Sequence, residues 1–461
     1  MTLIATSQQK VVIGLGATGV SVVRYLLRAG CVPVVLDSRA QPPGLEEFRK
    51  QFPDVPVQLG PLDEDSLLSA SEIITSPGVA LAEPALQRAL AEGIPVVGDI
   101  ELFAREINGL EQPPKIAAIT GSNGKSTVTT LLGQMAQRAG IRVGVGGNIG
   151  VPVLDLLEQG LPELYVLELS SFQLETTHTL AVTAATILNL SEDHMDRYPS
   201  MAAYHAAKQR IYRHAQQVVV NRDDPLTRAP LAEGVKEWSF GLDTPDLGQF
   251  GLRLVEGVEW LAQGVTKLMP LEDMAMVGRH NAANALAALA LGHAVGLPME
   301  AMLAVLREFP GLIHRCERIG DIDGVVFVND SKGTNVGATR AALEGLGSSE
   351  KKIVLIAGGE GKGADFSPLA EAATALRGLV TIGVDGPKIA AALAGACTAE
   401  SADSMDQAVA AAMAMAESGD YVLLSPACAS FDMYRNFEAR GEDFRRAVTA
   451  LGASVPAGGA Q

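Results

Sequence analysis

The stretch from Ile116 to Thr130 constrains the fold more than any other part of the chain. It begins with four apolar residues typical of a buried strand, continues through a glycine-containing turn, and then becomes helix-forming. Backbone N–H groups at a helix start point toward a bound anion, and the helix dipole favours its negative charge. A lysine and a hydroxyl open the helical part, as in loops that bind nucleotide phosphates and Mg²⁺. The residues of the ATP site predicted here are Gly121, Ser122, Asn123, Gly124, Lys125, Ser126 and Thr127.

The spacing of this loop departs from the common pattern G-x-x-x-x-G-K-[ST], because Ile119 stands where the first glycine would be. An ordinary turn between a strand and a helix is therefore the alternative interpretation. The preceding apolar strand and the pair Ser126 and Thr127 favour the nucleotide site. We expect Lys125 to reach the terminal phosphate oxygens of ATP and Ser126 to bind Mg²⁺.

Length and composition limit the fold class and the partners. The 461 residues suffice for about three domains, and 48% hydrophobic with 19% charged residues fits globular domains. The net charge of −17 argues against a nucleic-acid-binding surface, which would normally be basic. No apolar run approaches the roughly 18 residues of a membrane span, the N-terminus carries no secretory pattern, and the four cysteines lie far apart. We expect a cytoplasmic monomer that binds neither nucleic acid nor membrane.

The first expected domain, residues 1–104, alternates short apolar strands with helical segments in a Rossmann-like pattern. Its strand at Lys10–Ile13 leads into Gly14–Gly19, which reads G-x-G-x-x-G, and a second strand ends at Asp37. This arrangement is typical of a dinucleotide site. A tight turn without a ligand and an NAD site are alternatives. Arg39 and the second nucleotide site favour a uridine diphosphate group instead, with its pyrophosphate on the glycine turn.

The central domain, expected over residues 105–312, places polar residues directly after its strands, where open parallel sheets bind ligands. Glu168 closes an apolar strand, and burying its carboxylate without a partner would be costly. We favour a magnesium ligand over a structural ion pair for this residue. His194 follows another strand, although Mg²⁺ prefers oxygen ligands and a lone histidine more often caps a loop.

Two helical segments of the central domain carry further candidates. Lys208 lies in the segment Met201–Arg213, where a lysine is usually a solvated charge. The residues Gly278–Asn281 open a long alanine-rich helix expected over Ala282–Val295. Asn281 and Asn284 stand at its first turn, three residues apart and so on nearby faces. Asn281 is either an N-cap or, with Asn284, a residue that contacts an adenine edge.

The last domain, expected over residues 313–461, shows a second Rossmann-like pattern. Polar clusters at 329–335 and 425–430 each follow a strand, as does the glycine-rich run at 358–363. That run lacks the G-K-[ST] ending, so a flexible loop explains it nearly as well as a phosphate site. The expected fold class is α/β with three domains: Rossmann-like, a central P-loop-type parallel sheet that binds ATP, and again Rossmann-like.

Two classes of function fit these patterns. One is an ATP-dependent ligase that activates a carboxylate as an acyl phosphate. The other is an oxidoreductase that uses the first domain and keeps the central loop as a regulatory nucleotide site. A non-catalytic nucleotide switch would not need so many polar residues at strand ends. Glu168 and the cations of the last domain favour the ligase.

Several long motifs, in one order, resemble those of the Mur ligases and folylpolyglutamate synthetases. These motifs are Thr120–Thr127, Gly147–Gly150, Glu168–Gln173, Glu192–His194 and Gly278–Asn281. Two further motifs resemble those of the family members that add D-glutamate, namely Asp330–Asn335 and Ser425–Asp432. The resemblance extends from Gly14 to the region of Gly441, and Ile119 is normal for this family at its position.

The resemblance implies formation of a peptide bond between UDP-N-acetylmuramoyl-L-alanine and D-glutamate during peptidoglycan synthesis. The substrate carboxylate would attack the γ-phosphate of ATP to give an acyl phosphate. The amine of D-glutamate would then attack, and phosphate would leave. Such phosphoryl transfer depends mainly on positioning and on neutralisation of charge, for which the family uses two Mg²⁺ ions.

The family also implies roles for residues that match its motifs. The implied metal ligands are Ser126, Glu168, His194 and Lys208, the last as a carbamate whose oxygens suit Mg²⁺. The residues implied in catalysis are Lys125, His194 and Lys208. Further ATP contacts are Asn281, Asn284, Arg315 and Asp330. The implied contacts to the UDP-sugar substrate are Thr18, Asp37, Ser38, Arg39, Asn148 and Ser170. Those expected at the D-glutamate end are Lys332, Thr334, Lys362, Ser430 and Phe437.

Overall fold

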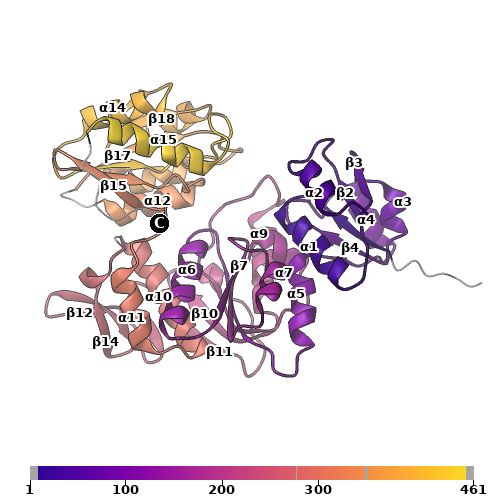
Figure 1. Cartoon of the computed structure of the whole chain (residues 1–461). Coiled ribbons are helices and arrows are strands. Elements are labelled where there is room, and N and C mark those ends of the chain that lie inside the picture. The colour runs from indigo at the N-terminus through magenta and orange to yellow at the C-terminus, as the bar shows by residue number, and fades with distance from the viewer. Residues whose placement is uncertain (1–8, 277, 348–350, 453–461) are drawn as a thin grey trace, which may run out of the picture.

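The computed structural model describes residues 9–276, 278–347 and 351–452. The two ends of the expected domain ranges, residues 1–8 and 453–461, therefore lie outside the described residues. Three α/β units follow one another along the chain, each built on its own sheet (Figure 1). The expected α/β class with three sheet-based units is confirmed.

The first unit is a five-stranded parallel sheet of order β3-β2-β1-β4-β5. Its central strand β1 is buried because Val11 pairs with Val34 on one side and with Ile73 on the other. The elements are β1 (Lys10–Ile13), α1 (Ala17–Arg28), β2 (Val34–Asp37), α2 (Leu45–Gln51), β3 (Val57–Leu59), α3 (Glu64–Leu68), β4 (Glu72–Thr75), α4 (Pro84–Ala91), β5 (Val96–Val97) and α5 (Asp99–Asn108). The division expected at residue 104 falls within α5, so the exact limit of this domain stays a prediction.

The central unit is a nine-stranded sheet of order β14-β13-β12-β11-β10-β9-β6-β8-β7. Its first part contains β6 (Lys115–Thr120), α6 (Lys125–Arg138), β7 (Val143–Gly147), α7 (Val153–Leu156), β8 (Leu164–Glu168), α8 (Ser171–Glu175), β9 (Val182–Ile187), α9 (Met201–Gln209) and β10 (Ala215–Asn221). Its second part contains β11 (Lys236–Phe240), β12 (Gln249–Val255), β13 (Val258–Gln263), β14 (Thr266–Pro270), α10 (Arg279–Val295) and α11 (Met299–Glu308).

This central sheet is parallel from β7 to β12, and β13 and β14 extend it as antiparallel strands. Residues 235–277 show no recognisable motif in the sequence, yet they supply these edge strands. Short turns make this extension possible, since Gly257 and Gly264 both adopt a positive φ. Helices α6, α10 and α11 pack on one face of the sheet and share one hydrophobic core with it.

The third unit is a six-stranded sheet of order β15-β16-β20-β17-β18-β19, in which only β15 runs antiparallel to its neighbour. Its elements are β15 (Glu317–Ile322), β16 (Val325–Asn329), α12 (Val336–Leu346), β17 (Ile353–Gly358), β18 (Leu376–Ile382), α13 (Gly386–Ala392), β19 (Thr398–Ser401), α14 (Met405–Met415), β20 (Tyr421–Leu424) and α15 (Phe437–Ala450). Strands β16, β17 and β20 are adjacent, so the polar loops that follow them open at the same edge.

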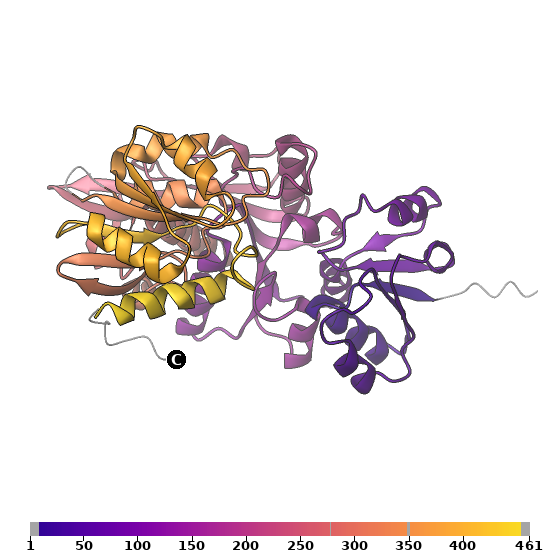
Figure 2. The ribbon, with the colours of Figure 1, turned by 90° about the horizontal axis from the view of Figure 1, so that it is seen from above.

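The third unit lies over the central one, whereas the first unit lies to one side of it (Figures 1 and 2). Helix α12 of the third unit packs on α10 of the central unit. The first unit is joined through α1, α5 and α7, and Arg24 forms an ion pair with Asp155 at 2.6 Å. Because of this arrangement, the loops of the second and third sheets face one another.

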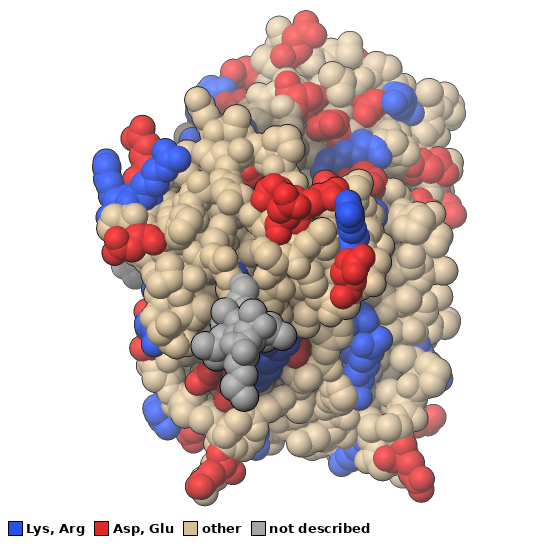
Figure 3. Space-filling model, turned by 90° about the vertical axis from the view of Figure 1, so that its right-hand side faces the viewer, with Lys and Arg blue, Asp and Glu red and all other residues tan. Residues whose placement is uncertain are grey.

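Charged side chains of both signs are intermixed on the face of the molecule that Figure 3 shows, without a continuous basic area. Within the described part of the chain, no helix has both the length and the apolar character required to cross a membrane.

Candidate active site

The loop Gly121–Gly124 joins β6 to α6 and takes its shape from two glycines with positive φ. A side chain at Gly124 would be strained by the φ of 82° and would displace Asn284, because its Cβ would lie 2.4 Å from Oδ1 of Asn284. The Lys125 ammonium folds back over the loop and donates to the carbonyl oxygens of Gly121 and Ser122, at 2.8 and 2.9 Å. Burial lowers the pKa of Lys125, and the Glu168 carboxylate opposes this effect.

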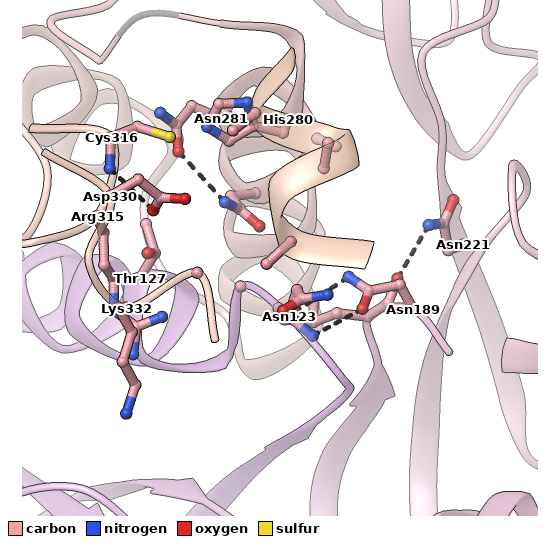
Figure 4. Close-up of a pocket in the computed structure, with 18 of the residues that line it drawn as sticks. Asn123, Thr127, Asn189, Asn221, His280, Asn281, Arg315, Cys316, Asp330 and Lys332 are labelled. Atoms are coloured by element: carbon pink, nitrogen blue, oxygen red, sulfur yellow. Dashed lines mark hydrogen bonds between the residues drawn. The ribbon is translucent and has the colours of Figure 1, made fainter. Parts of the chain in front are cut away.

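The segment after β9 holds this loop in place through side-chain hydrogen bonds. The backbone N–H of Asn123 donates to Oδ1 of Asn189, and the Asn189 amide returns a bond to the carbonyl of Asn123 (Figure 4). The hydroxyl of Ser122 donates to the carbonyl of Ser191 and accepts from its N–H, both at 3.0 Å. These hydrogen bonds hold the loop in place at the start of α6.

Glu168, at the end of β8, is a buried carboxylate beside the strand that leads into the loop. Its Oε1 accepts from the Asn148 amide at 2.7 Å, whereas its Oε2 is buried and has no hydrogen-bond partner among the described residues. An unpartnered carboxylate oxygen fits a magnesium ligand, which is the role expected from the sequence. No three acidic, histidine or cysteine side chains of the described residues form a ready-made cation site, so other oxygens must complete such a site.

Lys208 is buried, with only 2% of its surface exposed, so the alternative of a solvated surface charge is wrong. Its ammonium donates to the carbonyl of Gly121 at 2.9 Å and lies 4.7 Å from the centre of the Tyr204 ring. The pKa of Lys208 is well below its ordinary value because of burial, and the nearby Lys125 lowers it further.

His194 adopts a left-handed conformation with φ of 58°, and its ring packs edge-on against Phe172 at 4.8 Å. Burial lowers the pKa of His194, the Asp193 carboxylate opposes this effect, and the cations of Lys125 and Lys208 reinforce it. The lowered pKa favours the neutral imidazole, and a neutral imidazole offers a nitrogen lone pair to a metal ion.

A cavity of about 160 Å³ lies between the central unit and the third unit. Its polar lining comes from both units and consists of Asn123, Thr127, Asn189, Asn221, His280, Asn281, Asn284, Arg315, Cys316, Asp330 and Lys332. The structure thus places the four further residues predicted as ATP contacts, Asn281, Asn284, Arg315 and Asp330, in the same cavity as the phosphate loop, which lies more than a hundred positions earlier in the chain.

Asn281 does not cap its helix, because α10 begins at Arg279 with Gly278 as the N-cap, so that alternative is wrong. Its Oδ1 instead accepts from the Asn284 amide at 3.3 Å within the cavity (Figure 4). Arg315 crosses between the units and donates to the Ser126 hydroxyl at 2.7 Å. Arg315 therefore already neighbours the position where Lys125 and Ser126 would meet phosphate oxygens.

The third unit adds a second cation beside this cavity. The Lys332 ammonium lies 3.9 Å from the centre of the Phe437 ring, and burial together with Arg315 lowers the pKa of Lys332 to about 8. Its loop is tied to the loop after β20 by Arg440, which donates to the Ser331 hydroxyl and to the carbonyls of Cys428 and Ala429.

Three domain matches cover most of the chain. Residues 8–98 match the MurD-like N-terminal domain of Mur ligases, residues 119–292 match the Mur ligase middle domain, and residues 314–428 match the glutamate ligase domain of Mur ligases. The chain belongs to the Mur ligase family. The UDP-N-acetylmuramoylalanine–D-glutamate ligases of Pseudomonas fluorescens and Pseudomonas aeruginosa are each 54% identical to this Mur ligase over 453 residues, which is 98% of the chain and 100% of each relative.

Solved structures of other Mur ligases share the fold. The MurF ligase of Thermotoga maritima in complex with ADP superimposes with a TM-score of 0.60 at 16% identity, over 96% of this chain and 95% of that chain. A pseudomurein peptide ligase type C from Methanothermus fervidus gives 0.59 at 17% identity, over 96% of this chain and 100% of that one. At these identities the likeness concerns the fold alone.

Only some of the residues predicted to bind the amino acid are in contact with one another in this Mur ligase. Lys332 and Phe437 are in contact, and Ser430 is buried at the loop that Arg440 holds. Thr334 follows Lys332 in the same loop, and its N–H donates to the carbonyl of Lys332. Lys362 is exposed, with φ of 51°, and its ammonium lies 5.7 Å from the ring centre of Phe431.

The predicted UDP-sugar residues of this Mur ligase lie on two units. Asp37 is buried, and its carboxylate accepts from the N–H of Leu15 at 2.8 Å and from the guanidinium of Arg39. Its hydrogen bonds with Arg39 lower the pKa of Asp37 to about 2. Thr18 lies in the first turn of α1 and Ser38 is exposed beside Asp37.

The other two predicted substrate contacts already have partners within the central unit. Asn148 holds Glu168, and Ser170 caps α8 in a reciprocal pair with Gln173. Asn189, Asn221, His280 and Cys316 also line the cavity but were not among the predicted site residues. Asn189 and Asn221 lie at or just after strand ends and His280 lies at a helix start, and these positions are the signals that could have indicated them. Cys316 carries no such signal, since it precedes β15.

Proposed function

We propose that this Mur ligase joins D-glutamate to UDP-N-acetylmuramoyl-L-alanine in the cytoplasm, at the expense of ATP, during synthesis of peptidoglycan precursors. The observation that carries the proposal is the 54% identity to UDP-N-acetylmuramoylalanine–D-glutamate ligases along 98% of the chain. The geometry supports it, because the phosphate loop and the cations of the third unit face one cavity. We expect the enzyme to act as a monomer.

The residues around the phosphate loop suit the transfer of a phosphoryl group. Lys125 and Arg315 would neutralise negative charge on the terminal phosphates, while Asn281 and Asn284 line the part of the cavity that suits the adenine. The buried oxygen of Glu168 and the hydroxyl of Ser126 would hold Mg²⁺, together with His194. When bound, Mg²⁺ supplies further charge neutralisation on the phosphates.

We also propose a carbamate on Lys208. Burial lowers the pKa of this amine and so raises the fraction of its neutral form, which is the form that reacts with carbon dioxide. The reaction forms a bond between Nζ and the carbon atom and releases one proton. A carbamate at this position would present oxygens, which Mg²⁺ prefers, beside Gly121.

The first unit would hold the uridine diphosphate group through its glycine turn and through Thr18, Asp37, Ser38 and Arg39. An NAD site fits less well, since the Asp37 carboxylate is already paired with Arg39 and less able to accept from a ribose. Asn148 and Ser170 would contact the sugar and its alanine.

The third unit would select D-glutamate. Lys332, Thr334, Lys362 and Ser430 all follow strand ends at one sheet edge, and two cations with two hydroxyls suit an amino acid that carries two carboxylates. Phe437 would hold Lys332 in place through its ring.

Mass spectrometry of the product tests the proposal. Incubation with UDP-N-acetylmuramoyl-L-alanine, ATP, Mg²⁺ and D-glutamate should give a product heavier by one glutamyl residue, with one phosphate released per product. A reaction without ATP and a reaction of the Lys125→Ala variant are the controls. Phosphate release without the heavier product would show an ATPase and would contradict the proposal.

A further inference from the structure

The N-terminal end of α12 contacts the phosphate loop from the third unit. Asn335 is the N-cap of this helix, and its Oδ1 accepts from the N–H of Ala338 at 2.8 Å. Its side-chain amide carries two hydrogens, and the two acceptors near it both belong to the central unit. They are Oδ1 of Asn123 in the phosphate loop and Oδ2 of Asp193, each at 3.3 Å. One side chain thus joins its own helix to two loops of the opposite unit.

A close backbone approach accompanies these hydrogen bonds. A Cβ at Gly337 would lie 2.9 Å from Cβ of Ser191 and 2.6 Å from its hydroxyl oxygen. Ser191 in turn exchanges two hydrogen bonds with Ser122 of the phosphate loop. At the other end of α12, a Cβ at Gly345 would lie 2.4 Å from Nδ1 of His280, a residue of the cavity lining. The helix therefore meets the central unit at both ends, where glycines leave room.

We propose that Asn335 is a positioning residue that docks the third unit onto the phosphate loop and so aligns Arg315 and Lys332 with the nucleotide. Arg315 and Lys332 flank the strand pair that leads into α12, and Arg315 reaches Ser126 only across this interface. Asn335 touches no reacting atom itself. It acts through Asn123 and Asp193, so its loss lowers the fraction of molecules with the third unit docked. The kinetic part of this inference rests on the proposed ligation, whereas the docking contact does not.

A cysteine pair tests the docking contact without any assay of activity. In the double variant Ser191→Cys with Gly337→Cys, the two Cβ atoms would lie close to the roughly 3.8 Å that a disulfide prefers, after a small shift. We expect oxidation to link the two units within one chain, which mass spectrometry of a peptide digest detects. Each single variant serves as the control. Absence of the link under oxidising conditions, with and without ATP, would overturn the inference whatever the enzyme catalyses.

Two variants of Asn335 separate the cap from the contact across the units. Asn335→Ser keeps a side-chain oxygen that can cap α12. The serine side chain is too short to reach Oδ1 of Asn123 and Oδ2 of Asp193. Asn335→Asp also keeps the cap and sets a carboxylate against Asp193. We expect both variants to melt within a few degrees of the parent protein. Their kcat/KM for ATP should fall about tenfold for Asn335→Ser and further for Asn335→Asp.

Exchanging the two side chains of the Asn335–Asp193 hydrogen bond distinguishes a positioning role of Asn335 from a general loss of structure. Asp193→Asn, introduced into the Asn335→Asp variant, replaces two facing carboxylates by an amide and a carboxylate. We expect kcat/KM for ATP to recover several-fold relative to Asn335→Asp alone. Unchanged kinetics in both Asn335 variants, or additive losses in the double variant, would overturn the inference. If the parent protein lacked ligase activity but the cysteine pair formed its link, the proposed function would fail and the docking contact would stand.

Discussion

Lys125 and Lys208 donate hydrogen bonds to the same acceptor, the backbone carbonyl oxygen of Gly121, at 2.8 and 2.9 Å. Two amines that converge on one oxygen repel each other when both are charged, and Lys125 indeed contributes to the lowered pKa of Lys208. The Glu168 carboxylate favours the charged form of both amines, and its own second oxygen has no hydrogen-bond partner among the described residues. This cluster concentrates charges that phosphate and Mg²⁺ would offset.

Replacement of Lys125 by alanine should abolish ligation and leave the fold intact. Without this ammonium, negative charge that develops on the phosphates is not compensated, an effect of roughly 10²-fold or more on kcat. Steady-state phosphate release and circular dichroism measure the two properties. Lys50→Ala, at an exposed lysine of α2, is the matched control and should keep full activity. Turnover at the parent rate by a well-folded Lys125→Ala variant would contradict the ATP assignment.

Removal of carbon dioxide should lower the activity if Lys208 carries a carbamate. We expect the rate to fall in buffer stripped of bicarbonate and to recover when bicarbonate is added, because the modification is reversible. Lys208→Ala should be inactive in both buffers. Carbon-13 NMR after addition of labelled bicarbonate should show one carbamate resonance that this variant lacks. Full activity without carbon dioxide would exclude the carbamate.

The sequence was informative where the chemistry is local. The carboxyl ends of strands such as β6 and β8 could be located from apolar runs that stop at polar residues, and these runs correctly placed Glu168 at a strand end. The pairing of β8 with β6, which brings Glu168 beside the phosphate loop, is a finding of the structure. Contacts between the units could not be predicted, because they depend on how the sheets face each other. The bond from Arg315 to Ser126 is one such contact.

The burial of single polar residues could not be predicted from the sequence either. Nothing in the helical pattern of Met201–Arg213 indicates that Lys208 points into the protein, since a lysine in a helix is normally solvated. The sequence of residues 235–277 indicates short strands and turns, but the individual strands β12 to β14 could not be located for a different reason. Strands such as Thr266–Pro270 are short and half-exposed, so they lack the apolar runs of the buried parallel strands.

The first unit should bind a uridine nucleotide and not NAD. Calorimetric titration with UDP should give measurable binding, while NADH fluorescence should not change. Arg39→Ala should weaken UDP binding by about tenfold if this half-exposed guanidinium contacts the diphosphate. The exposed residue Arg49 of α2 provides the control variant Arg49→Ala. Tight binding of NADH without binding of UDP would revive the oxidoreductase hypothesis.

The stability of the protein should depend on ionisation of Asp330. Burial raises the pKa of this carboxyl from 3.8 to about 6, so the folded state holds the proton more tightly than the unfolded state. Its contribution to the free energy of unfolding is therefore complete below about pH 4 and is lost as the pH rises through about 6. The side chain of the Asp330→Asn variant does not ionise, so this variant does not lose that contribution to the free energy of unfolding as the pH rises. Urea unfolding at pH 4.5 and 7.5 should show that the free energy of unfolding of the variant rises relative to that of the parent protein by about 2 kcal/mol between the two pH values. If the two proteins differed in free energy of unfolding by the same amount at both pH values, the raised pKa of Asp330 would be contradicted.

Residues of the third unit should govern the requirement for D-glutamate. Lys362→Ala and Ser430→Ala should raise the KM for D-glutamate by about tenfold or more, because each removes a partner of a carboxylate, and should leave the KM for ATP nearly unchanged. Lys388→Ala, at an exposed lysine of α13, is a control with no expected effect. An equal rise in both KM values would indicate a general defect of the third unit.

The selection of the amino acid tests the central claim most directly. Phosphate release should be measured with ATP, Mg²⁺ and UDP-N-acetylmuramoyl-L-alanine, while D-glutamate, L-glutamate, D-alanine and diaminopimelate are supplied in turn. Loss of the side-chain carboxylate would leave buried cations without partners, which typically costs a few kcal/mol. We therefore predict rapid release only with D-glutamate. Equal rates with any of the other three amino acids would contradict the assignment.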